Sequence, residues 1–95
     1  MLFAVICNDK SGNVELRAAN REAHLSFLAG LGKSVKLGGP MMDSAASFMN
    51  GSLLIVEAET LEAAKAMMAG DPYAEAGLFE SVEVRPWRWA VNPPA

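Results

Sequence analysis

The two side chains best suited to acid–base chemistry in this sequence are His24, its single histidine, and Asp71. When a carboxylate accepts a hydrogen bond from one ring nitrogen of an imidazole, it fixes the tautomer and raises the basicity of the other nitrogen. No hydroxyl or thiol group lies in a recognisable nucleophile motif, so the pair favours proton transfer over acyl transfer. A histidine that only packs and forms a hydrogen bond is the alternative.

Asp71 is expected to begin a very short helix. An aspartate directly before a proline is a helix-start signal, because the carboxylate accepts backbone N–H bonds at the N-cap and Pro72 suits the first helical position. Gly77 offers a left-handed stop, so the helix is barely longer than one turn. The carboxylate is therefore held at the mouth of the strand that follows. Asp71 acting only as a cap stays open as an alternative.

His24 lies in a longer helix, predicted for residues 14–31, in which apolar residues recur at helical spacing. The predicted inward set is Leu16, Ala19, Ala23, Phe27 and Leu31, and the polar set toward the other side is Arg17, Glu22 and Ser26. His24 stands three residues before Phe27, on or beside the apolar stripe, and therefore within reach of the sheet edge.

Five further residues are candidates for binding a substrate near this pair. An arginine one turn before the histidine could receive an anionic group, with a solvated helix arginine as the alternative. The glycine and proline at 39–40 could bring backbone amides close to a ligand, although the phosphate-loop pattern GxxxxGK is missing. Two aromatic rings could line a pocket or belong to the core. The full set is Arg21, Gly39, Pro40, Tyr73 and Phe79.

Composition excludes several classes of function. Eight basic residues are dispersed among eleven acidic ones, with a net charge of −3, so no basic stripe for nucleic acid is expected. Cys7 is alone, which excludes an internal disulfide, and its apolar strand indicates a small core residue. One histidine and scattered carboxylates provide no metal-ligand set, and no cofactor is implied. The longest apolar run, residues 1–7, is too short to span a membrane. We expect a soluble, cytoplasmic protein.

The hydrophobic pattern predicts one domain over residues 1–95. Continuous apolar runs at 2–7 and 53–56 are typical of strands buried on both faces. The predicted strands cover residues 2–7, 33–38, 52–59 and 78–89, and a second helix, capped by Thr60, covers 61–69. The order β-α-β-β-α-β predicts an α+β ferredoxin-like fold, in which two helices cover one face of a four-stranded antiparallel sheet.

The two strands that are apolar on both faces require a cover for the second face of the sheet. An apolar content of 52% is high for a chain of 95 residues, and no further segment is left to supply that cover. We therefore expect sheet-to-sheet homodimerisation, with a higher homo-oligomer also compatible.

The connection at residues 39–51 is too apolar for a solvated loop. Its apolar residues are Met41, Met42, Phe48 and Met49. We expect these side chains to close over the cleft or to pack on a partner chain, since an exposed apolar loop promotes aggregation. Asn50-Gly51 predicts a turn at the end of this connection.

Several motifs together resemble the YciI-like (YCII-related) family. They are Arg21-x-x-His24-x-x-Phe27-Leu28, Gly38-Gly39-Pro40, Gly51-Ser52-Leu53-Leu54-Ile55-Val56, Asp71-Pro72-Tyr73, Ala76-Gly77-Leu78-Phe79 and Val82-Glu83-Val84-Arg85-Pro86-Trp87. The resemblance extends from the first predicted strand to Trp87. It implies a ferredoxin-like domain that dimerises as an α+β barrel. It also implies a small cleft in which His24 is the family histidine and Asp71 the family aspartate.

The resemblance further implies a small-molecule enzyme of acid–base type. One branch of the family removes chloride from a chlorinated hydroxyquinol-type ring. We therefore expect lyase, isomerase or dehydrochlorinase chemistry on a small anionic or cyclic molecule, with His24 as base, Asp71 as its orienting partner and Arg21 as an anion clamp. A dimeric module that binds a small ligand without turnover is the second hypothesis. Related α+β barrels degrade haem, but beyond the single histidine the pattern does not require a haem ligand.

Overall fold

The computed structural model describes the whole chain, residues 1–95. Its elements follow the predicted order, with a 3-10 turn after the first helix and a one-turn helix before the last strand. They are β1 (Leu2–Asp9), α1 (Val14–Leu31), η1 (Gly32–Ser34), β2 (Val35–Met42), β3 (Met49–Glu57), α2 (Leu61–Ala69), α3 (Pro72–Glu75) and β4 (Phe79–Trp87).

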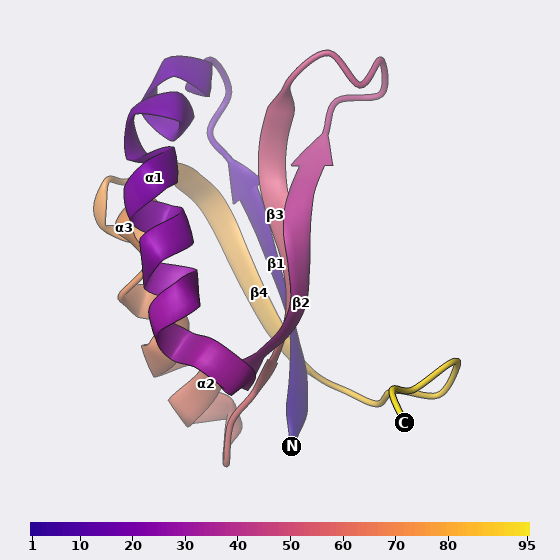
Figure 1. Cartoon of the computed structure of the whole chain (residues 1–95). Helices are drawn as coiled ribbons and strands as arrows, with labels where there is room; N and C mark the ends of the chain where they lie inside the picture. Colours follow the sequence, from indigo (N-terminus) through magenta and orange to yellow (C-terminus); the bar gives the residue numbers. More distant parts are fainter.

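The four strands form one antiparallel sheet in the order β2-β3-β1-β4, so β2 and β4 are its edges. All three helices lie on one face of this sheet, and the other face carries no helix (Figure 1). The α+β ferredoxin-like fold expected from the order of the elements is thereby confirmed.

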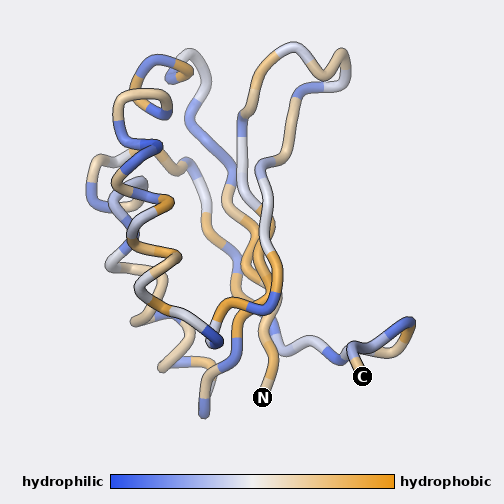
Figure 2. The backbone as a smooth tube through the Cα atoms, viewed as in Figure 1, coloured by the Kyte–Doolittle hydropathy of each residue, from blue (hydrophilic) through white to orange (hydrophobic).

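The core lies between the sheet and the helices. Side chains alternate along β1, so Phe3, Val5 and Cys7 point to the helices and are almost completely buried. Val5 faces Leu54 across the β1–β3 register, and α2 closes the layer with the fully buried Ala64. Figure 2 shows the same pattern as a concentration of apolar residues along the middle of the sheet. Burial of this apolar surface is the main stabilising contribution.

Local signals determine where the helices begin and end. The Thr60 hydroxyl accepts a hydrogen bond from the backbone N–H of Ala63 at 3.0 Å, which is the predicted N-cap of α2. α1 ends at Gly32, which has a φ of 56°. Because a side chain is strained in that left-handed conformation, glycine suits this end.

The inward face of α1 differs from the predicted one. Ala19 and Ala23, which were expected to face the core, are exposed, and the buried residues of the helix are Arg17 and His24. These two residues are seven positions apart, about two helical turns, and so share one face. The prediction placed Arg17 toward solvent. It was wrong because Asp9, at the end of β1, neutralises this arginine inside the fold.

The β2–β3 connection is shorter than predicted. β2 continues through residues 39–42, and Asn50-Gly51 lies inside β3 rather than in a turn. Pro40 is tolerated because an edge strand has one side free of ladder hydrogen bonds. The actual turn spans residues 43–48, where the Asp43 carboxylate accepts backbone N–H bonds from Ser47 and Phe48 at 2.7 and 3.0 Å.

The open face of the sheet is apolar in part. Leu53 alternates with the buried Leu54 and is 40% exposed, and Leu37, which pairs with Ile55 across the β2–β3 register, is 42% exposed. Trp87 at the end of β4 is 36% exposed. None of the helices is long and apolar enough to cross a membrane.

Candidate active site

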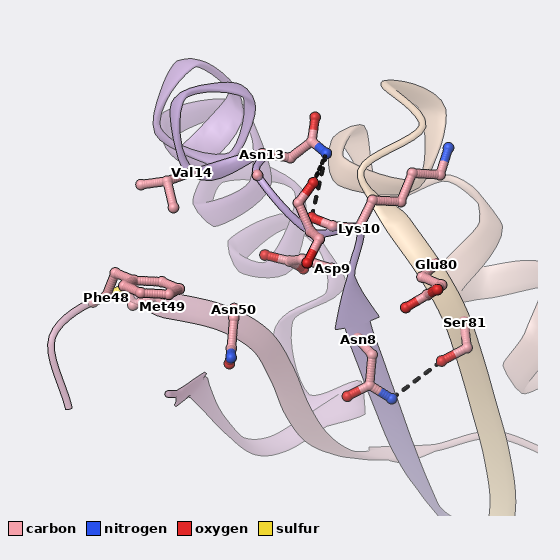
Figure 3. A pocket seen from close by; sticks show the side chains of 12 residues that line it. Asn8, Asp9, Lys10, Asn13, Val14, Phe48, Met49, Asn50, Glu80 and Ser81 are labelled. Carbon is pink, nitrogen blue, oxygen red and sulfur yellow. Dashed lines mark hydrogen bonds between the residues drawn. The ribbon is translucent and has the colours of Figure 1, made fainter. Parts of the chain in front are cut away.

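Two clefts are candidates for the functional site. The larger, about 420 Å³, lies where β1 and β4 meet the end of the β2–β3 hairpin, and its lining is mostly polar. Figure 3 shows Asn50 on one side of this cleft and Glu80 and Ser81 on the other. It contains no histidine. The smaller, about 140 Å³, lies between α1 and the hairpin and is lined by His24. We assign the candidate site to the smaller cleft, because of the two it is the one lined by His24.

His24 and Asp71 are in direct contact. Nδ1 of His24 lies 2.9 Å from Oδ1 and 3.0 Å from Oδ2 of Asp71. An ionised carboxylate only accepts hydrogen bonds, so Nδ1 is the donor and Nε2 is the nitrogen left to meet a ligand. The residues are 7% and 1% exposed, which screens the contact from water. This arrangement can accept or donate a proton at Nε2.

The Asp71 carboxylate also caps α3. Its Oδ1 accepts a hydrogen bond from the backbone N–H of Tyr73 at 2.9 Å, while Pro72 occupies the first helical position as predicted. Gly77, with a φ of 75°, ends this short segment in the predicted left-handed conformation. The cap and the contact with His24 are therefore made by one carboxylate, which is held in place from two sides.

Tyr73 extends this arrangement into the cleft. Its ring stacks on His24 with 4.0 Å between ring centroids and 16° between the planes. Burial raises the pKa of the Tyr73 phenol, and Asp71 raises it further, while Arg17 and Arg21 oppose the shift. The phenol is therefore neutral near pH 7 and can donate a hydrogen bond to a ligand oxygen.

Arg17 is the residue of this site that sequence analysis missed. Its Nη1 donates to both carboxylate oxygens of Asp9 at 3.0 and 2.9 Å, and its Nη2 donates to the Gly51 carbonyl and to Ser52 Oγ, each at 2.9 Å. The guanidinium also lies 4.6 Å from the centre of the Tyr73 ring. Its position two turns before His24 was the available signal, because such residues share a helix face.

Most of the predicted binding residues gather around this pair. Arg21, Gly39, Pro40 and Tyr73 all line the cleft with His24. Phe79 does not line it. Its ring, at the start of β4, instead packs edge-on against Tyr73, with 6.0 Å between centroids and 80° between planes.

The buried cysteine has no partner for nucleophilic chemistry. Burial, with the nearby charges of Asp71 and Asp9, raises the pKa of the Cys7 thiol to about 12, although Arg17 opposes the shift. A thiol that stays protonated is a poor nucleophile. No group of three or more histidine, cysteine or acidic side chains is arranged to hold a metal ion.

Comparison with known proteins relates this chain to a family. The sequence profile of the YCII-related domain matches residues 1–88. Protein YciI from Escherichia coli O6:H1 is 39% identical over 95 residues, covering 93% of this chain and 97% of its own. An uncharacterised protein from Haemophilus influenzae is 36% identical over 96 residues, with the same coverage of both chains.

One solved structure combines sequence and structural similarity. It is 5-chloro-2-hydroxyhydroquinone dehydrochlorinase from Burkholderia phenoliruptrix, in complex with 2,5-dihydroxybenzoquinone. This enzyme is 33% identical to the chain with a TM-score of 0.89, and the match covers 95% of this chain and 96% of the enzyme.

Proposed function

This chain belongs to the YCII-related family, and on that basis we propose that it is a small-molecule enzyme of acid–base type. The proposed substrates are small, anionic or cyclic organic molecules, and the reaction is a lyase, isomerase or dehydrochlorinase step. The single observation that carries this proposal is the buried contact between His24 Nδ1 and the Asp71 carboxylate at 2.9 Å, on the wall of a cleft.

In the proposed mechanism His24 Nε2 is the base. Asp71 orients the ring and stabilises the imidazolium that forms after the proton is taken up. In a dehydrochlorination of a chlorinated hydroxyquinol, one hydroxyl proton first moves to the chlorine-bearing ring carbon, and that hydroxyl becomes a C=O. His24 then removes a proton from a second hydroxyl group, whose O–H electron pair forms a second C=O, the ring double bond shifts, and chloride leaves with the pair of the C–Cl bond. The reaction therefore releases one proton and one chloride ion and needs no oxidant or reductant.

The other cleft residues are proposed to bind the oxygens of the substrate. Arg21 supplies a positive charge at the cleft, and the neutral Tyr73 phenol supplies a donor. The Ser52 hydroxyl already accepts from Arg17, so its own hydrogen remains available to a ligand oxygen. These donors complement an ionised ring oxygen, on which negative charge develops as the proton leaves. The 33% identical dehydrochlorinase, which acts on a hydroxylated ring, supports this substrate class.

A dimeric binding module without turnover is the second candidate function. The observation that favours it is that the Asp71 carboxylate also caps α3. In a protein that only binds a ligand, Asp71 could serve as the cap of α3 and His24 as its buried hydrogen-bond partner. The geometry would then be the same without any role in catalysis.

Chloride release separates the two candidates. The protein is incubated with 5-chloro-2-hydroxyhydroquinone, and chloride is measured against a protein-free blank and against His24→Ala. Release above the blank that is lost in the variant is the expected result. Saturable binding of 2,5-dihydroxybenzoquinone without release would instead favour the binding module.

We also propose that the domain, residues 1–95, acts as a homodimer in the cytoplasm. The partner would cover the helix-free face of the sheet, where Leu37, Leu53 and Trp87 are between 36% and 42% exposed. Burying such a face against its symmetric copy is the simplest way to remove it from water.

A further inference from the structure

The cleft beside His24 is one part of a longer groove along α1. A second hollow of about 270 Å³ lies next to it and shares Arg17, Arg21 and Met49 with it. Ala18 and Leu25 of this helix each line one of the two hollows. The other helix residues that line them are Val14, Arg17, Arg21, His24 and Leu28. Their spacing of three to four residues defines one continuous face, about 21 Å long at 1.5 Å per residue.

The opposite wall of the groove is the β2–β3 hairpin. The cleft beside His24, called the lower hollow below, is lined by two pairs of residues that face each other across the two strands. These pairs are Gly38 with Leu54 and Pro40 with Ser52. The second hollow, called the upper hollow below, is lined by the paired residues Met42 and Met49 of the same two strands, together with Phe48 in the turn. Helix and hairpin therefore run alongside each other past both hollows.

The two ends of the groove differ in chemistry. The lower hollow carries the polar groups of the proposed site and holds about 140 Å³, close to the size of an engineered cavity that binds benzene, about 150 Å³. It suits one six-membered ring. The upper hollow is lined mainly by apolar side chains, of which Val14, Met42 and Phe48 are 48%, 45% and 44% exposed.

We infer that the substrate of this protein is a hydroxylated ring that carries an apolar substituent, with the ring beside His24 and the substituent in the upper hollow. This inference rests on the proposed function. Its specific support is that the upper hollow lines up with the reactive cleft along the same helix face. Its partly exposed apolar side chains also lose contact with water when an apolar group enters. Arg17, Arg21 and Met49, which line both hollows, are the long side chains that lie at their junction.

Binding of two matched probes tests the inference. The probes are 2,5-dihydroxybenzoquinone and the same ring with a hexyl chain at carbon 3, titrated calorimetrically into the full chain. Since each buried methylene increases affinity by roughly three- to fourfold, we expect the hexyl compound to bind at least about tenfold more tightly. Equal affinities would overturn the inference and leave the proposed function intact. If the unsubstituted ring does not bind, the proposed function fails and the inference with it.

Two variants locate the hexyl chain. Ala18→Gln places an amide in the upper hollow, while Ala19→Gln makes the same change at an exposed neighbour that lines neither hollow. We expect Ala18→Gln to reduce the extra affinity of the hexyl probe by roughly five- to tenfold. Its affinity for the unsubstituted ring should be unchanged, and Ala19→Gln should behave like the wild type. A hexyl advantage that survives Ala18→Gln would place the chain elsewhere and overturn the inference.

Discussion

At the scale of single residues, Asp71 performs two tasks that local sequence and tertiary structure assign separately. The cap on α3 follows from the Asp-Pro dipeptide, since Tyr73, whose N–H it accepts, is only two residues away. The contact with His24 joins positions 47 residues apart and depends on how α1 packs. A carboxylate with both tasks has little freedom to move, which suits a group that must orient an imidazole.

Removing the imidazole tests its proposed role as base. We expect His24→Ala to lower the rate of chloride release by about 10²–10⁴-fold, because general acid–base catalysis typically contributes that much. The rate is measured at saturating substrate, and urea unfolding of the same variant controls for loss of structure. A variant that is folded and retains the wild-type rate would contradict the role.

Changing the carboxylate to an amide tests the orienting role. Asp71→Asn keeps a good N-cap residue but removes the charge and can select the wrong tautomer of His24. We expect a lower rate with nearly unchanged stability, whereas Asp71→Ala should also lose about 1 kcal/mol of stability through the missing cap. Kinetics and urea unfolding of both variants make the comparison. If Asp71→Asn is as active as the wild type, the charge of Asp71 has no part in the reaction.

The Cys7 thiol should be inert in the native protein. With a pKa of about 12 and 1% exposure, only about one thiol in 10⁴ is ionised at pH 8, so iodoacetamide should label Cys7 only after unfolding. The unfolded thiol ionises near its ordinary value of 9.0. The stability that the buried, protonated Cys7 thiol contributes is therefore fully present below pH 9 and is lost as the pH rises toward 12. Mass spectrometry after labelling at pH 8 provides the measurement, and rapid native labelling would contradict the burial.

At the scale of elements, Arg17 connects one helix with two strands. From α1 it bonds the end of β1 through Asp9 and reaches β3 through the Gly51 carbonyl and Ser52. The rotation of α1 follows from these bonds, and the same rotation directs His24, two turns later, toward Asp71. Removal of water from such a charged pair is costly, so its partners must remain together.

Breaking this connection should destabilise the fold. Arg17→Ala leaves the Asp9 carboxylate buried and unpaired, and we expect the free energy of unfolding to fall by about 3–5 kcal/mol. The control is Arg85→Ala, which removes an exposed arginine 3.9 Å from Glu83 and should change stability very little. Urea unfolding compares the two, and equal stabilities would show that the Asp9–Arg17 contact does not hold α1 in place.

At the scale of the whole molecule, the two faces of the sheet are covered unequally. One face of the sheet is packed by three helices, whereas the other has no covering element (Figure 1). That open face presents the partly exposed Leu37, Leu53 and Trp87. The proposed dimer would join two such faces. It would also leave the groove between α1 and the hairpin unobstructed by the sheet contact, because that groove lies on the helix side.

Sedimentation at micromolar concentration tests the dimer. We expect a species near twice 10.1 kDa. Leu53→Glu, which places a charge on the open face, should shift the protein toward the monomer, and Ala19→Glu on the exposed side of α1 is the matched control. A wild-type protein that sediments as a folded monomer would exclude the sheet-to-sheet dimer.

The sequence by itself determined the features that depend on neighbouring residues. The order of strands and helices, the Thr60 and Asp71 caps and the glycine stop at Gly77 follow from spacing and backbone chemistry within a few residues. The identity of His24 and Asp71 as a candidate pair came from their residue types and from the family resemblance.

Tertiary structure alone decided the features that depend on distant partners. Asp9 and Ser52 let the charged Arg17 face inward and set the rotation of α1, which exposed Ala19 and Ala23 against expectation. Strand pairing drew Asn50-Gly51 into β3, where Gly51 is needed because an added Cβ would lie 2.6 Å from the Cys7 carbonyl oxygen. In both cases the energy of a long-range contact outweighed a local preference, and no local pattern contains that contact.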